Sequence, residues 1–188
     1  MIRTYKYKLY NTKKLNHIHR TINIAGIIYN HCIALHKRYY KLYGKSLNKF
    51  QLQKHLTKLK KRDKYRYWNK LGSQAIQNIT ERIDEGYKKF YKKQGGLPSF
   101  KKVSKYKSFT LKGKIGYKLE DNIISLNGYK YKFWKSREIN GKVKTVTIKR
   151  DNIGDFYICI SLEIEESKYN ITSGKTVGID FGLSKFLV

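Results

Sequence analysis

Acidic residues are scarce in this sequence: 13 Asp and Glu stand against 42 Lys and Arg, which leaves a formal net charge of +29 over 188 residues. Self-repulsion of this size opposes a compact fold unless a polyanion neutralises it. A phosphate backbone is such a polyanion, because binding to it releases condensed counterions. An anionic membrane favours a local polybasic tail or one basic amphipathic helix, whereas the lysines here run from Lys6 to Lys185. The charge therefore indicates a nucleic acid as the partner and argues against a membrane.

Cysteine and long apolar runs are also scarce. Cys32 and Cys159 lie far apart in the sequence and neither belongs to a CxxC pair. This predicts two reduced, buried thiols in a cytoplasmic protein and no zinc site. No apolar run approaches the ~20 residues that span a bilayer, and no N-terminal apolar segment indicates secretion.

Aromatic residues are plentiful and are interleaved with the cations: the sequence has 17 Tyr, 8 Phe and 2 Trp. Examples are the segments 5–8, 65–68 and 129–134. Aromatic faces stack on unpaired bases while cations follow phosphates, which is how proteins hold RNA and single strands. Tyr and Phe also form strands and fill cores, and we expect about half of these rings to be buried.

Apolar residues spaced three and four apart predict three amphipathic helices after a short opening strand. The first helix runs to Gly44, and Asn11-Thr12 is its expected cap. The second helix begins at Asn48, a good capping residue. The third opens at Ser73 and ends before Gly95. The expected product is a small bundle with basic outer faces.

From about residue 105 the periodicity changes to two, which is typical of strands. The expected strands cover 106–110, 123–126, 129–133, 143–148 and 156–162. Short strands joined by turns argue for a small barrel or a strongly curved antiparallel sheet. We expect the opening strand to pair with them, which makes the helices an insertion into a β domain.

Asp180 is the one residue that suggests catalytic chemistry. It lies on the apolar stretch 176–183 and is followed by Phe181-Gly182. A carboxylate held on a strand before x-Gly is how RNase H-like nucleases begin, and these hold two metal ions with several carboxylates. Actin-like ATPases and sugar kinases begin in the same way, and an Asp at this position can also simply cap a turn. One carboxylate cannot hold two metals, so we expect no DNA cleavage by this chain alone.

Several stretches of the sequence, taken in order, match one family. They are 5–10, Tyr29-Asn30, 73–78, 86–91, 97–101, 142–148 and 178–183. Together they resemble the N-terminal half of TnpB (OrfB-type) proteins of insertion sequences, the RNA-guided nucleases related to type V CRISPR effectors. Two departures are Gly86, where the family has Ala, and Thr12-Lys13, where members often have Pro.

The resemblance implies an α+β fold in which a helical recognition bundle is inserted into a small antiparallel β-barrel of the wedge or OB-like type. The first strand of an RNase H-like (RuvC) fold would follow. The implied boundaries are 1–12 for the first barrel strand, 13–102 for the recognition domain, 103–170 for the rest of the barrel, and 171–188 for a linker and the RuvC strand.

The resemblance also implies a function: a transposon-encoded RNA-guided DNA-binding protein whose partners are a guide RNA and target DNA. Asp180 would be the first catalytic and metal-binding acid, and Mg²⁺ would bind only in a completed nuclease domain. The family's later acids and its zinc element lie beyond Val188, so we expect a truncated chain. The location would be cytoplasmic and nucleoid-associated, of bacterial or archaeal type.

Two sets of site residues follow. In the family, target-adjacent DNA is read at positions that match Lys49, Ser73, Gln74, Gln77 and Thr110. Gln can bond adenine bidentately in the major groove, although Ser73 and Gln74 could instead cap their helix. The guide RNA is expected along lysines that alternate with apolar residues in strands: Lys6, Lys8, Lys130, Lys132, Lys144 and Lys149.

Three alternatives remain open at this stage. The first is a structural RNA-binding protein of the ribosomal kind, which makes no sequence-specific DNA contact. The second is a nuclease-dead RNA-guided repressor that acts by occupying its target. The third is an actin-like ATPase, which is disfavoured because a large domain would have to follow Asp180.

Overall fold

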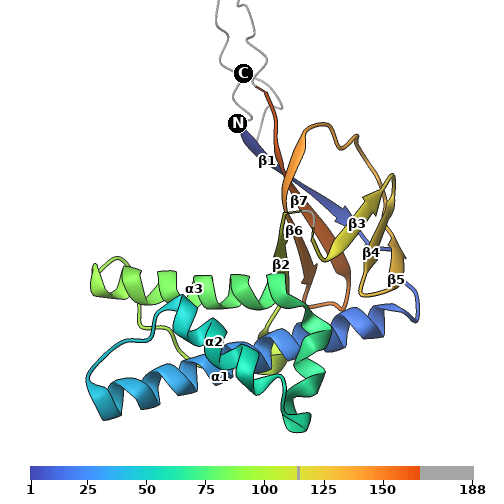
Figure 1. Cartoon of the computed structure of the whole chain (residues 1–188). Helices are drawn as coiled ribbons and strands as arrows, with labels where there is room; N and C mark the ends of the chain where they lie inside the picture. The colour runs from blue at the N-terminus through green and yellow to red at the C-terminus, as the bar shows by residue number, and fades with distance from the viewer. Residues whose placement is uncertain (114, 166–188) are drawn as a thin grey trace, which may run out of the picture.

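The computed structural model describes residues 1–113 and 115–165, so Asp180 and the strand expected around it lie outside the described residues. The helical layer contains three α-helices and a 3₁₀ segment that joins the last two (Figure 1). They are α1 (Leu15–Tyr43), α2 (Lys49–Leu59), η1 (Asp63–Leu71) and α3 (Ser73–Tyr91), and a short 3₁₀ turn η2 (Val103–Lys105) follows. None of the described helices is long and apolar enough to cross a membrane.

The strands form two antiparallel sheets in the described residues. The first has the order β1-β7-β6-β2, from Ile2–Lys8, Phe156–Glu163, Lys142–Arg150 and Ser108–Lys112. The second has the order β3-β4-β5, from Tyr117–Glu120, Ile123–Leu126 and Tyr129–Lys132. The sequence predicted five of these strands near their observed positions, together with the opening strand, and missed β3.

The opening strand does join the later strands, as predicted. β1 pairs with β7 in register from Ile2 opposite Glu163 to Lys8 opposite Tyr157. Because α1, α2 and α3 lie between β1 and β2 in the sequence, the helices interrupt one β-sheet (Figure 1). The division into recognition and wedge domains at the boundaries given above remains a prediction.

The strands form antiparallel sheets, as predicted, but they do not close into the small barrel that was one of the two expected forms. A single bridge between Leu9 and Phe133 links the end of β1 to the end of β5, and no ladder joins β2 to β3 in the described part of the chain. The reason is local: Asn127 and Gly128 both have positive φ, at 49° and 82°, which is the pattern of a tight hairpin turn. The short strands β3, β4 and β5 therefore pair with one another as a meander and leave the β2 side open.

The predicted helix boundary signals at Gly44 and Asn48 are confirmed. Gly44 adopts the left-handed conformation (φ 63°) after α1, and the Asn48 side chain accepts a hydrogen bond from the Gln51 N–H at 3.0 Å in a capping box. The Asn11-Thr12 cap is wrong, because α1 begins after Lys14 without a side-chain cap. The chain is still paired with β5 at Tyr10, so the helix starts later than its capping signal.

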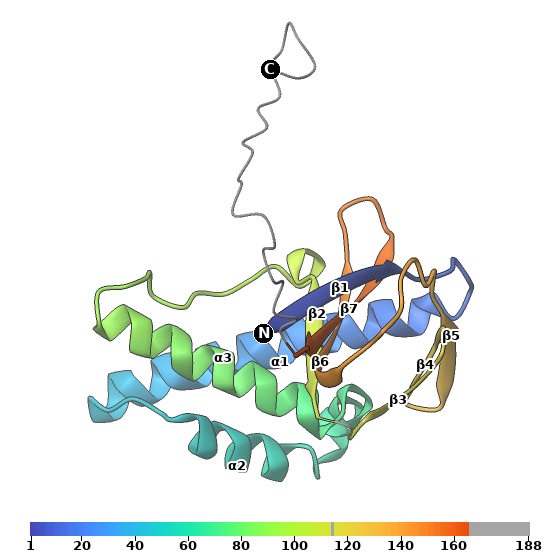
Figure 2. The same ribbon diagram turned by 90° about the horizontal axis from the view of Figure 1, so that it is seen from above.

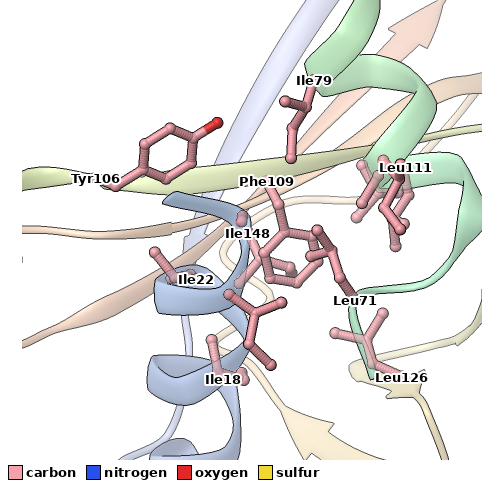
Figure 3. Packing of buried hydrophobic residues seen from close by; sticks show 14 of the residues in the cluster. Ile18, Ile22, Leu71, Ile79, Tyr106, Phe109, Leu111, Leu126 and Ile148 are labelled. Atoms are coloured by element: carbon pink, nitrogen blue, oxygen red, sulfur yellow. The ribbon is translucent and has the colours of Figure 1, made fainter. Parts of the chain in front are cut away.

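The helices and the four-stranded sheet share one apolar core. Ile18 and Ile22 of α1, Ile79 of α3 and Phe109 of β2 all pack into it (Figure 3). Each of these side chains is at most 4% exposed. Sharing of a core fixes the helical layer against one face of the sheet.

Acid is expected to destabilise this fold. Burial is the main cause that lowers the pKa of all five histidines, His17, His19, His31, His36 and His55. His31 and His55 lie with their Nε2 atoms 3.1 Å apart and join α1 to α2. Because the unfolded chain binds protons near pH 6.5 and the folded chain only at lower pH, stability falls as the pH drops below that value.

Urea unfolding at pH 7.5 and pH 5.0 tests this, and the midpoint should be lower at pH 5.0. The range lies above the ordinary carboxylate pKa values, so it reports histidine. Replacement of both His31 and His55 with Gln should reduce the difference between the two midpoints. Equal midpoints in the original chain would contradict the expectation.

Candidate nucleic-acid interface

The face of the four-stranded sheet that points away from the core carries lysines and hydroxyls. Successive residues of a strand point to opposite faces, and Tyr7 and Ile158 point inward, at 1% and 0% exposure. Lys6, on the outer face of β1, is one end of a cross-strand row that continues through Cys159, Thr147 and Thr110. The next row runs Lys8, Tyr157, Lys149 and Ser108.

The bridge between the sheets extends this face onto β5. The Tyr10 N–H donates to the Lys132 carbonyl at 3.0 Å, and the Trp134 N–H donates to the Lys8 carbonyl at 2.9 Å. Leu9 and Phe133 point into the core, so their neighbours point outward together. Lys132 thus lies on the same side as Lys8, and the Trp134 ring stacks on Tyr10 with centroids 4.3 Å apart.

Five of the six lysines predicted for RNA therefore share one continuous surface, which we call the lysine face: Lys6, Lys8, Lys130, Lys132 and Lys149. The sixth, Lys144, lies beside the irregular register between Val143 and Thr145, towards the far end of the sheet. It pairs with Glu163 at 2.8 Å. This contact, through its hydrogen bond, lowers the pKa of the Glu163 carboxyl.

Some of the cations are already partly neutralised. Lys8 contacts Asp155 at 2.6 Å, and this hydrogen bond raises the pKa of Lys8. Lys6 lies over the Tyr157 ring, with Nζ 4.0 Å from the ring centroid. By contrast, Lys130, Lys132 and Lys149 form no salt bridge with any described residue. These three are the cations most available to an added phosphate.

Three of the residues predicted for DNA come together where α3 meets β2. Ser73, Gln77 and Glu81 are spaced by four on α3 and so follow one face of the helix. Glu81 forms an ion pair with Lys112 of β2, two residues after Thr110 on the same face of the strand. The Thr110 hydroxyl bonds the Thr147 hydroxyl at 2.8 Å, which connects this junction to the lysine face.

The other two DNA residues are placed differently. Gln74 is half-buried and lines, with Ser73, a cavity of about 130 Å³ beside Leu111. Lys49 lies at the start of α2, with Nζ 5.1 Å from the Phe50 ring centroid. The Gln53 amide bonds the Thr80 hydroxyl. This bond places the Gln53 part of α2 beside Thr80 of α3. Lys49, one turn before Gln53 on α2, therefore lies far from Ser73 at the start of α3.

The capping interpretation of Ser73 and Gln74 is wrong. Gly72 occupies the position before α3 with φ 83°, and no side chain caps the helix. Ser73 and Gln77 are exposed and free of a capping role. The structure thus leaves both side chains open to a ligand.

Sequence reasoning did not list Lys112, Tyr10 or Trp134 as site residues. The alternation of 129–134 marked Trp134 as an aromatic of interest but could not show its direction. That direction depends on the bridge between Leu9 and Phe133, which has no local signal. Lys112 could have been found, because it continues the alternation of β2 beyond Thr110.

The two thiols are both free, as predicted. Cys32 is fully buried, and burial raises its pKa to about 12. Cys159 is only half-buried, which corrects the prediction, because it lies on the outer face between Lys6 and Thr147. In residues 1–113 and 115–165 no three His, Cys, Asp or Glu side chains are grouped as metal ligands.

No protein-family model matches the chain. A stretch of 114 residues, 60% of this chain, is 31% identical to a protein of Escherichia coli (strain K12) described as "Putative RNA-guided DNA endonuclease InsQ". The match covers 28% of that relative, so the chain spans less than a third of its length. The similarity to InsQ supports a TnpB-family relationship for this chain, the relationship that the order of its sequence motifs predicts.

Proposed function

We propose that this chain binds a guide RNA and target DNA as the nucleic-acid-binding part of a TnpB-like RNA-guided DNA endonuclease. The observation that carries the proposal is the lysine face, where five cations from β1, β5 and β6 lie on one surface. The similarity to InsQ supports the guided, DNA-directed form of this binding. In these terms the helical layer is the recognition domain and the two sheets are the wedge domain.

The lysine face suits RNA because it combines three kinds of group. Exposed ammonium groups bind phosphates, and the Thr4–Ser161 and Thr110–Thr147 hydroxyl pairs offer hydrogen bonds to sugars. The Tyr10–Trp134 stack offers an aromatic face, since Trp134 is 58% exposed. Unpaired bases at the edge of a folded RNA can extend such a stack.

The α3–β2 junction is the proposed site for target-adjacent DNA. Gln77 is exposed on α3 and can donate to and accept from an adenine edge in the major groove. Ser73 opens α3, two turns before Glu81, and Thr110 lies two residues before Lys112 on β2, so both can bond backbone or base atoms near the Glu81–Lys112 ion pair. Gln74 and Lys49 would contribute from their own positions, Gln74 from the cavity wall and Lys49 through a phosphate.

Cleavage would depend on Asp180, which lies outside the described residues. Nucleases of this kind hold two Mg²⁺ ions with several carboxylates, and the ions activate water and stabilise the leaving oxygen. Asp180 is this chain's candidate for one of those carboxylates, and the others would have to come from elsewhere. Association with the nucleoid would follow from the same binding.

A structural RNA-binding protein without DNA targeting is the second candidate, because the lysine face would bind RNA in either kind of protein. A nuclease-dead repressor would use both surfaces and would never cut. DNA binding that depends on a bound RNA separates the guided forms from the structural one.

The test uses the purified chain before and after ribonuclease treatment. We expect RNA to co-purify, and its removal to abolish selection from a DNA library with randomised flanking sequence. Gln77→Ala should weaken the preferred flank by roughly 5- to 100-fold relative to other sequences. Lys49→Ala is the matched control, since loss of a DNA phosphate contact should weaken all sequences alike. DNA binding that does not depend on the RNA would refute the proposal of guided binding. Equal loss of affinity for every flanking sequence in Gln77→Ala would refute the proposed role of Gln77.

A further inference from the structure

The end of the helical layer farthest from the sheets carries exposed aromatic rings. The last turns of α1 and α3 lie there, and the chain that follows α3 starts there and runs back towards the sheets (Figures 1 and 2). We call this surface the helical tip and define it by Tyr40, Tyr43, Phe90 and Tyr91 of the helices, together with Phe100, which lies beside Lys37 of α1. Their side chains are 53%, 62%, 38%, 55% and 54% exposed, respectively. A patch of exposed apolar side chains marks a binding surface more often than single, scattered exposed apolar residues do.

The chain that carries Phe100 is held in place on both sides. The Asn30 side chain forms two hydrogen bonds with the backbone of Lys101, at 2.8 and 2.9 Å, and the Tyr29 hydroxyl donates to the Ser99 carbonyl at 3.2 Å. On the α3 side, a Cβ added to Gly86 would lie only 3.1 Å from Pro98. Phe100 is therefore presented to solvent by a fixed backbone.

The rings of α1 and α3 are also ordered against their neighbours. Tyr43 lies 4.7 Å from Tyr39 between ring centroids, and Phe90 lies 5.6 Å from Tyr91. The Tyr91 hydroxyl bonds the Ser46 hydroxyl at 2.6 Å, which ties the loop after α1 to the end of α3. Rings that are already ordered lose little entropy when a ligand stacks on them.

The charge around the rings identifies the partner. No Asp or Glu occurs in residues 37–48 or 86–102, the segments that build the tip. The cations there are Lys37, Arg38, Lys41, Lys45, Lys88, Lys89, Lys92, Lys93, Lys101 and Lys102, and Lys88 is paired with Asp84. Lys37 lies over Phe100, with Nζ 4.8 Å from the ring centroid. A second copy of this cationic chain would be repelled, whereas a polyanion with exposed π-faces fits both features.

We infer that the helical tip binds single-stranded nucleic acid by stacking unpaired bases on Tyr43 and Phe100 while the surrounding lysines hold the phosphates. Duplex bases already stack on one another and hide their faces, so the tip should favour a single strand. The inference shares with the proposed function only the premise that the partner is a nucleic acid, because the tip and the lysine face are different surfaces.

The experiment compares two fluorescent probes, a 15-nucleotide oligouridine and an RNA duplex of 15 base pairs, by anisotropy. The double variant Tyr43→Leu/Phe100→Leu keeps apolar area and removes both rings. It should bind the single strand about tenfold or more weakly and the duplex within about twofold of the original chain. The variant Tyr43→Phe/Phe100→Tyr keeps both rings and should retain the affinity.

Lys6→Ala/Lys149→Ala is the control that separates the two surfaces, because it should weaken both probes. If the leucine variant binds the single strand as well as the original chain, or loses equally on both probes, stacking at the tip is refuted. If the lysine variant binds both probes as well as the original chain while the leucine variant loses affinity for the single strand, the lysine face is refuted as a binding site and the inference about the tip is supported.

Discussion

Alanine at Lys6, Lys130, Lys132 and Lys149 together is expected to weaken RNA binding by about two orders of magnitude near physiological salt. These side chains come from β1, β5 and β6 and share the lysine face. Each phosphate contact that is lost should also reduce the salt dependence, by a slope of roughly 0.7 to 0.9. The log–log plot of affinity against salt should therefore flatten by about three units.

A charge-matched pair of variants gives the control. Lys130→Ala/Lys149→Ala removes two cations that no described residue neutralises. Lys88→Ala/Lys135→Ala removes two that are already bound to acids, Lys88 to Asp84 at 2.7 Å and Lys135 to Asp121 at 2.8 Å. The first pair should lose clearly more affinity than the second. Equal losses would mean that only net charge matters and that the lysine face is not a site.

Phe133→Ala is expected to lower the free energy of unfolding by about 3–5 kcal/mol. The ring is fully buried, and its centroid lies 5.2 Å from that of Tyr7. Phe133 also forms, with Leu9, the one bridge that the described strands make between the two sheets. Its loss should leave a cavity at the point where the sheets meet, and urea unfolding measures the effect.

Trp134→Ala is the matched control at the next position. Trp134 points outward, is 58% exposed and stacks on Tyr10, so its removal should change stability by no more than about 1 kcal/mol. It should nevertheless weaken RNA binding, because it removes an aromatic face from the interface. Equal destabilisation by the two variants would contradict the assignment of inward and outward faces.

Local signals predicted the helices and most of the strands well. Gly44 ends α1 and Asn48 caps α2, because both act on backbone groups within one turn. β4 lies at Ile123–Leu126, as its alternation indicated. The small barrel and the Asn11-Thr12 cap failed for different reasons. The tight turn at Asn127-Gly128 pairs β4 with β5 in a separate meander. The cap does not form because Tyr10, immediately before it, is still bonded to the distant Lys132.

The candidate site divides in the same way. The excess of Lys and Arg indicated a polyanion as the partner, and the alternation of residues in the predicted strands indicated that six lysines face outward on their own strands. Neither composition nor alternation could show that Gln77 and Thr110 lie near one ion pair, because its partners Glu81 and Lys112 belong to different elements. They also could not show that Lys49 lies elsewhere.

The sequence by itself indicated the kind of partner that we propose, since charge and aromatic content do not depend on folding, and it determined the helices, whose hydrogen bonds are local. Only the tertiary structure decided which cations act together. The side to which a strand residue points is fixed relative to its own strand, but its neighbours across strands are set by pairing. Here the bridge from Leu9 to Phe133 places Lys8 and Lys132 on one face, although more than a hundred residues separate them.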